Sequence, residues 1–182
     1  MDLKAVGNEL YLIGDFQPAF GGSHFNIIQG DQGIVKGEAV PQVGENGPKV
    51  YRAFHQTVRA GLVESAHDLS EGGLAVAVAE MCIGGRLGLE CDLGTVAKAP
   101  GVRTNLHALF AETTGCLLVE VKSENASEFE ACFAGLPITR IGLVSSEPAL
   151  AIRIENNSLI SLSIPALVTA WNTPLQPRSQ AL

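Results

Sequence analysis

Short apolar runs separated by polar turns recur along the chain and predict a protein built on a β-sheet. The run Leu87–Leu93 partly alternates, with apolar residues on one face and Glu90 and Asp92 on the other, as a half-buried strand requires. The pair Asn156-Asn157 between two apolar runs is typical of a hairpin turn. About five to seven strands are predicted, with candidates at Leu10–Ile13, Val63–Ala66, Leu87–Leu93, Cys116–Val121, Ile138–Val144, Leu150–Glu155 and Ser158–Leu162.

Longer segments with helical spacing lie between several of these strands. Residues 48–61 carry a stripe at Val50, Phe54 and Val58, and residues 74–83 are apolar nearly all round except at Glu80, which predicts a buried helix. Further helices are expected at 123–134 and 164–171, with a helical turn at 105–110. The pattern favours an α+β fold, with helices packed on one mixed β-sheet. We expect a single domain over residues 1–172 and a frayed tail at 173–182.

Composition excludes several classes of protein. The 182 residues carry a net charge of -7 and no cluster of Lys or Arg, which argues against a nucleic-acid partner. No apolar run reaches the roughly 18 residues that cross a membrane, and no signal peptide is evident. The four cysteines, Cys82, Cys91, Cys116 and Cys132, lack zinc-site spacing and are expected as buried free thiols. The cytoplasm is the expected location.

The segment His67-Asp68-Leu69-Ser70-Glu71-Gly72-Gly73 is the strongest candidate for a functional site. It follows a predicted strand and opens the buried helix, so Ser70 is expected as the N-cap and Glu71 in the first turn. The amides of Gly72 and Gly73 could receive a phosphate oxygen, and Asp68 offers the carboxylate that magnesium prefers. The segment therefore predicts a nucleotide or phosphate site, although the same residues would also form a capped helix that binds nothing.

Two other polar turns are weaker candidates. Gly21-Gly22-Ser23-His24 could contact an anion, but such a stretch is more often only a tight turn. Glu112 lies in the polar turn before a buried strand, where it could face a cleft or be a plain loop carboxylate. His107 is expected at the surface or its boundary.

The residues from Val50 to Met81 resemble the phosphoribosylformylglycinamidine synthase family, in the C-terminal type of domain shared with aminoimidazole ribonucleotide synthetase. The resemblance rests on Val50–His55, Gly61–Val63 and above all His67–Ala77, whose His-Asp-x-Ser-(Asp/Glu)-Gly-Gly run is specific. It extends to Leu10–Gly14, Gly21–Ser23, Leu109–Glu112 and Ile141–Val144, and so covers nearly the whole chain.

The resemblance implies an ATP-dependent carbon–nitrogen ligase of purine biosynthesis. ATP would phosphorylate the amide oxygen of formylglycinamide ribonucleotide, and ammonia delivered from glutamine by a glutaminase partner would displace the phosphate, with Mg2+ shielding the charges. Family members combine N-terminal-type and C-terminal-type domains. This chain resembles one C-terminal-type domain and is expected to be a piece of a longer protein, because it lacks the N-terminal-type domain that supplies the catalytic histidine. We therefore expect no turnover by the chain alone.

The family motif implies a role for individual residues. It assigns magnesium binding to Asp68, nucleotide contact to Ser70, and its glycines to Gly72 and Gly73. Glu112 matches the first residue of a Glu-Ser-Gln substrate motif, but Thr113 and Thr114 follow it here, which fits better with the degenerate second copy of the domain. Two alternatives stay open: a structural domain of that synthetase without its own ligand site, or a domain of another ATP-dependent enzyme of the superfamily.

Overall fold

A seven-stranded mixed sheet forms the centre of the molecule. The computed structural model describes residues 1–29 and 38–173. The strands lie in the order β2-β4-β1-β5-β3-β6-β7. Their bounds are Glu9–Ile13 (β1), Ser65–Asp68 (β2), Gly88–Asp92 (β3), Leu117–Val121 (β4), Ile138–Ser145 (β5), Ala149–Ile154 (β6) and Asn157–Ser163 (β7).

All of the candidate strands are present, at the upper end of the predicted count, and the predicted α+β class is confirmed. Neighbouring strands run antiparallel except β3 and β6, which pair in parallel with Leu89 opposite Leu150. The first strand in the sequence lies between β4 and β5, both of which come more than a hundred residues later. The predicted hairpin is also confirmed, because β6 and β7 pair with Ile154 opposite Asn157.

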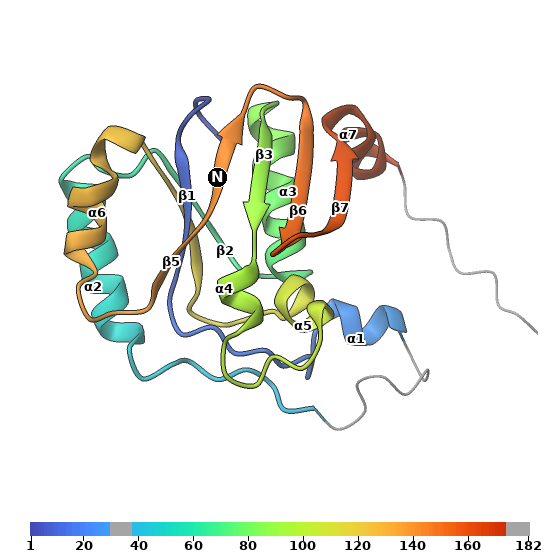
Figure 1. Cartoon of the computed structure of the whole chain (residues 1–182). Helices are drawn as coiled ribbons and strands as arrows, with labels where there is room; N and C mark the ends of the chain where they lie inside the picture. Colours follow the sequence, from blue (N-terminus) through green and yellow to red (C-terminus); the bar gives the residue numbers. More distant parts are fainter. Residues whose placement is uncertain (30–37, 174–182) are drawn as a thin grey trace, which may run out of the picture.

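Two hydrophobic cores lie on the two faces of this sheet. In β1, Leu10 and Leu12 belong to one core, whereas Tyr11 and Ile13 belong to the other, as the alternation of a strand requires. Helix α3 (Gly73–Gly85) packs into the first core, and α2 (Gly47–Arg59) and α6 (Ala126–Cys132) pack into the second. Figure 1 shows α2 and α6 side by side on one flank and α3 with α7 (Ile164–Asn172) on the other.

The predicted helices are present, with differences in detail. The short helices α1 (His24–Gln29) and α4 (Gly94–Ala97) lie outside the helices that the sequence predicts. Residues 105–110 form α5 (Asn105–Phe110), and a 3-10 turn (Ser123–Asn125) precedes α6. The buried face of α2 is rotated by part of a helical turn from the predicted stripe. Val50, Ala53 and Thr57 are buried, whereas Val58 is 47% exposed. Thr57 can be buried because its hydroxyl donates to the Phe54 carbonyl.

Other expectations have mixed outcomes. Three of the cysteines are buried free thiols as predicted, but Cys132 is free and exposed at the end of α6. His107 is buried, not at the surface, and stacks on Phe20.

Within residues 1–29 and 38–173, no helix is long and apolar enough to cross a membrane. The predicted tail lies outside the described residues apart from Thr173.

Candidate functional site

The predicted site lies where β2 ends and α3 begins. Helix α3 starts at Gly73, and its N-cap is Gly72 in a left-handed conformation with φ of 84°. The predictions that Ser70 caps the helix and that Glu71 lies in its first turn were therefore wrong. The reason is that the chain makes one further tight turn after Ser70, which only glycine enters without strain.

The two glycine amides are already used within the protein. The N–H of Gly73 donates to the Ser70 carbonyl at 3.1 Å. The N–H of Gly72 donates to Oε1 of Glu112 at 2.8 Å, and the same oxygen accepts from the N–H of His24 at 2.8 Å. A carboxylate of the chain itself therefore lies where a phosphate oxygen was predicted.

Gly73 brings the start of α3 against the segment that carries Glu112. A Cβ atom at Gly73 would lie 2.7 Å from the Ala111 carbonyl oxygen and 2.7 Å from the Phe110 carbonyl carbon. The φ of Gly73 is +65°, a second reason why glycine is needed here. This close approach puts Glu112 within reach of the Gly72 amide.

Asp68, the predicted magnesium ligand, is an accessible carboxylate of the corner. Its side chain is 66% exposed, and Oδ1 lies 3.1 Å from Nδ1 of His67. The other ring nitrogen of His67 lies 2.7 Å from Oε2 of Glu80 on α3. The buried His67 ring thus links the last residue of β2 to the helix. Ser70 is half-buried, and its hydroxyl has no hydrogen bond to the described residues.

The structure brings together three turns that the sequence identified separately: Gly21–His24, Asp68–Gly73 and the turn containing Glu112. A hydroxyl of Thr113 further ties the third turn to the main chain of Gln17. Sequence reasoning missed His67 and Glu80 as partners. They are 13 residues apart, on a strand and a helix, so no local periodicity connects them. The sequence offered two signals for this pair: His67 stands next to Asp68, and Glu80 is the one acidic residue within the apolar run 74–83.

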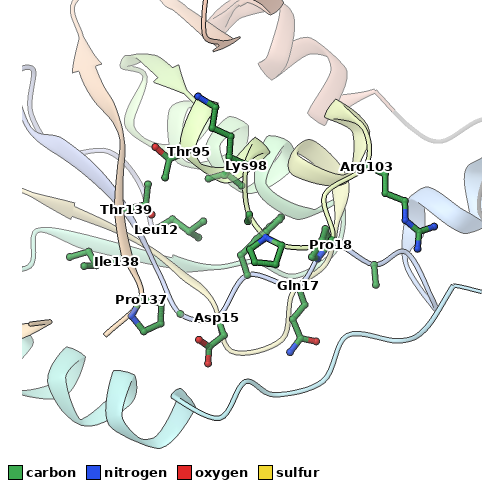
Figure 2. A pocket seen from close by; sticks show the side chains of 17 residues that line it. Leu12, Asp15, Gln17, Pro18, Thr95, Lys98, Arg103, Pro137, Ile138 and Thr139 are labelled. Atoms are coloured by element: carbon green, nitrogen blue, oxygen red, sulfur yellow. The ribbon is translucent and has the colours of Figure 1, made fainter. Parts of the chain in front are cut away.

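A cleft of about 820 Å³ lies elsewhere, between the ends of β1 and β5 and the segment around α4 (Figure 2). None of the five predicted site residues lines it. Two charged groups at its border have partners in the chain: Lys98 pairs with Glu155 at 2.7 Å, and Asp15 accepts from Asn46. The third, Arg103, has no polar partner among the described residues. The remaining wall is largely apolar, so the cleft offers few polar groups that converge on a ligand.

The site residues fit one of the two implied ligands better than the other. Magnesium is often held by one or two carboxylates together with substrate phosphates, and the exposed Asp68 suits that arrangement. No group of three acidic, histidine or cysteine side chains that could hold a metal occurs among the described residues. The amides of Gly72 and Gly73 do not fit a phosphate group in this structure, because both already donate to acceptors of the chain.

Comparison with known proteins identifies a family and several relatives. Residues 5–155 match the model of the family described as AIR synthase related protein, C-terminal domain. Over 97% of its length, the chain is 32% identical to phosphoribosylformylglycinamidine synthase subunit PurL of Deinococcus radiodurans. It is 33% identical to the same subunit of Lactobacillus helveticus over 94% of its length. It spans only 24% and 21% of these two relatives.

Solved structures of low identity share the fold. Thermotoga maritima PurL in complex with FGAR superposes with a TM-score of 0.73 at 21% identity, covering 100% of this chain and 30% of that one. The hydrogenase maturation protein HypE of Escherichia coli superposes with a TM-score of 0.57 at 17% identity, covering 90% of this chain and 51% of the other.

Proposed function

Because the chain belongs to the family of AIR synthase related C-terminal domains, we propose that it is one C-terminal-type domain of a phosphoribosylformylglycinamidine synthase. The observation that carries the proposal is the identity of 32% and 33% to two subunits of that synthase over nearly the whole chain. The HypE-like fold, shared at 17% identity, would by itself leave other superfamily enzymes equally open.

The proposed reaction converts the amide of formylglycinamide ribonucleotide to an amidine. ATP would supply the phosphoryl group that activates the amide oxygen, and ammonia from a glutaminase partner would replace that oxygen. Thermotoga maritima PurL, which shares this fold, has been solved in complex with ATP, with ADP and with FGAR, which supports these ligand classes. We assign no step of this chemistry to a residue of this chain. Its proposed partners are the N-terminal-type domains of the synthase and the glutaminase.

Within this proposal, Asp68 is the candidate magnesium ligand, and Ser70, Gly72 and Gly73 are candidate phosphate contacts. The exposure of Asp68 supports the first assignment. The phosphate assignment requires that Glu112 leave the Gly72 amide, so it depends on a rearrangement of that side chain. A cytoplasmic location is also proposed, and the four free thiols are consistent with a reducing compartment.

A structural domain of the same synthase is the second candidate function. One observation favours it: the carboxylate of Glu112 satisfies the amide that a phosphate would need. In this case the domain would support a neighbouring domain and bind no nucleotide of its own. Magnesium-dependent binding of ATP distinguishes the two candidates.

The test uses the complete open reading frame that contains this chain. We expect its product to form amidine from formylglycinamide ribonucleotide, ATP, Mg2+ and ammonia, whereas the 182-residue chain alone should form none. A full-length product without this activity would contradict the synthase assignment. Calorimetric titration with Mg2+ and ATP then compares the full-length protein with Asp68→Asn and with a control, Glu71→Gln. A loss of affinity confined to Asp68→Asn supports a ligand site, and equal affinity in all three supports the structural role.

A further inference from the structure

Glu112 is the point at which three separate segments of the chain meet. One of its carboxylate oxygens accepts hydrogen bonds from the main chain of His24 and of Gly72, both at 2.8 Å. The ring nitrogen Nδ1 of His24 lies 3.6 Å from the same oxygen. The side chain is only 18% exposed, although it lies in a polar turn. Glu112 is therefore a mostly buried anion, held in a site that main-chain amides form.

The position of Glu112 is fixed by its neighbours. The turn after it is held by Thr113, whose hydroxyl donates to the Gln17 carbonyl at 2.9 Å and accepts from the Gln17 N–H at 3.3 Å. The turn before it is in contact with Gly73, where a Cβ atom would be 2.7 Å from the Ala111 oxygen. The fold therefore holds the carboxylate at the Gly72 amide. It is not a surface side chain that rotates freely and meets this amide by chance.

The Glu112 carboxylate at the Gly72 amide excludes a second anion from the same place. A phosphate on the Gly72 amide would have to displace the Glu112 oxygen or lie directly against it. Two negative charges within a few ångströms of each other repel strongly at a partly buried site. The displaced state would also leave the His24 amide without its charged acceptor.

We infer that Glu112 is a built-in anion that occupies the phosphate position of the Gly72 corner, so that this domain closes its own anion site with a carboxylate. The inference goes beyond the proposed function, because it concerns how the three turns hold together and holds for any activity of the whole protein. It also predicts that the corner binds no phosphate as long as the Glu112 carboxylate stays on the Gly72 amide.

The first test is chemical rescue of the 182-residue chain. Glu112→Ala removes the acceptor from two amides, and its melting temperature should fall by roughly 3–10 °C more than that of the control Glu71→Ala. Glu71 is a suitable control because it lies in the same corner, is exposed and has no polar contact to the described residues. Formate or inorganic phosphate should then raise the melting temperature of Glu112→Ala more than chloride of equal ionic strength does. Neither anion should do so for wild type or Glu71→Ala.

The second test observes the amide directly. In wild type, the NMR signal of the Gly72 amide should not shift saturably with millimolar inorganic phosphate, whereas in Glu112→Ala it should. If Glu112→Ala does not fold, Glu112→Gln takes its place. The neutral oxygen of the Gln side chain still accepts from both amides but no longer repels phosphate. The Glu112→Gln protein should therefore bind phosphate more tightly than wild type does.

Three results would overturn the inference. One is saturable phosphate binding at Gly72 in wild type. Another is a Glu112→Ala protein that is as stable as Glu71→Ala or is not rescued by either anion. The third is equal phosphate binding by wild type and Glu112→Gln. All of these are measured without ligase activity, so their outcome is independent of the synthase assignment.

Discussion

The carboxylate of Glu120 is fully buried in β4 and accepts hydrogen bonds from the backbone N–H of Lys4, at 2.9 and 3.0 Å to its two oxygens. The N–H of Ala5, the side-chain amide of Asn8 and the hydroxyl of Ser65 also donate to it. A buried charge without a counter-ion is tolerated only when hydrogen bonds compensate for lost water. Glu120 therefore attaches the segment before β1 to the neighbouring strand β4.

We predict that Glu120→Gln lowers the free energy of unfolding by about 2–4 kcal/mol. The amide replaces one acceptor oxygen by an N–H₂ group that faces other donors, and the hydrogen bonds to its remaining oxygen are no longer strengthened by a negative charge. Urea denaturation measures the change. Glu124→Gln is the matched control, since Glu124 is exposed on the following turn, and it should change stability by less than about 0.5 kcal/mol. Equal effects of the two substitutions would show that the buried carboxylate contributes little.

Gly73 allows a second comparison with a control inside the chain. Gly73 and Gly135 both have positive φ, +65° and +75°, but only Gly73 lies close to other main-chain atoms. Replacing either by Ala incurs the cost of a left-handed residue, about 1 kcal/mol. Gly73→Ala should cost at least about 1–2 kcal/mol more, because its Cβ would clash with the Ala111 carbonyl. Chemical denaturation of the two variants tests the difference, and equal costs would contradict the close approach.

The contacts of His67 should differ in strength. A double-mutant cycle with His67→Ala and Glu80→Ala is expected to give a coupling of about 1–2 kcal/mol, because the ring is buried and the contact is 2.7 Å. The same cycle with Asp68→Ala should give less than about 0.5 kcal/mol, because that carboxylate is 66% exposed and screened by water. A larger coupling to Asp68 than to Glu80 would disprove this ranking.

The buried thiols make stability depend on alkaline pH. Burial raises the pKa of Cys82 and of Cys116 from 9.0 to about 12, and it also raises the pKa of Cys91. The folded protein therefore keeps thiol protons that the unfolded chain loses above pH 9, which favours unfolding. This contribution is complete below pH 9 and is lost as the pH rises toward 12.

We accordingly expect the urea midpoint to fall between about pH 8 and about pH 10.5. The fall should be smaller in Cys82→Ala, which removes one of the shifted groups, and unchanged in Cys132→Ser, whose thiol is exposed. A midpoint that falls equally in Cys82→Ala and wild type would show that other groups cause the pH dependence.

The strands were predictable because their apolar runs and turns are local properties of the sequence. Their order was not, because β1 pairs with β4 and β5, and no local pattern connects those segments. The face of α2 was misjudged because the stripe was drawn through Val50, Phe54 and Val58, which left out Thr57. The hydroxyl of Thr57 is satisfied by the main chain, so this side chain can be buried. In α4, four residues are too few to produce a recognisable helical period.

The candidate site was located by its sequence motif, but its internal bonds were not. The residue types around Asp68 and Gly72 indicated an anion or metal corner, and Glu112 was identified separately as an uncertain loop carboxylate. That the two meet depends on Gly73 packing against Ala111, a contact between segments almost forty residues apart. Sequence motifs define which groups are available, whereas packing decides whether one of them is used within the protein itself.

The position of β1 has a consequence for how the chain is assembled during synthesis. The segment from Glu9 to Ile13 leaves the ribosome well before its two hydrogen-bonding neighbours, which follow it by more than a hundred residues. Until then its apolar side chains have no native sheet to join, and nascent chains halted before β4 would expose them to chaperones and proteases. Completion of β4 and β5 is therefore the step at which the emerging polypeptide becomes protected.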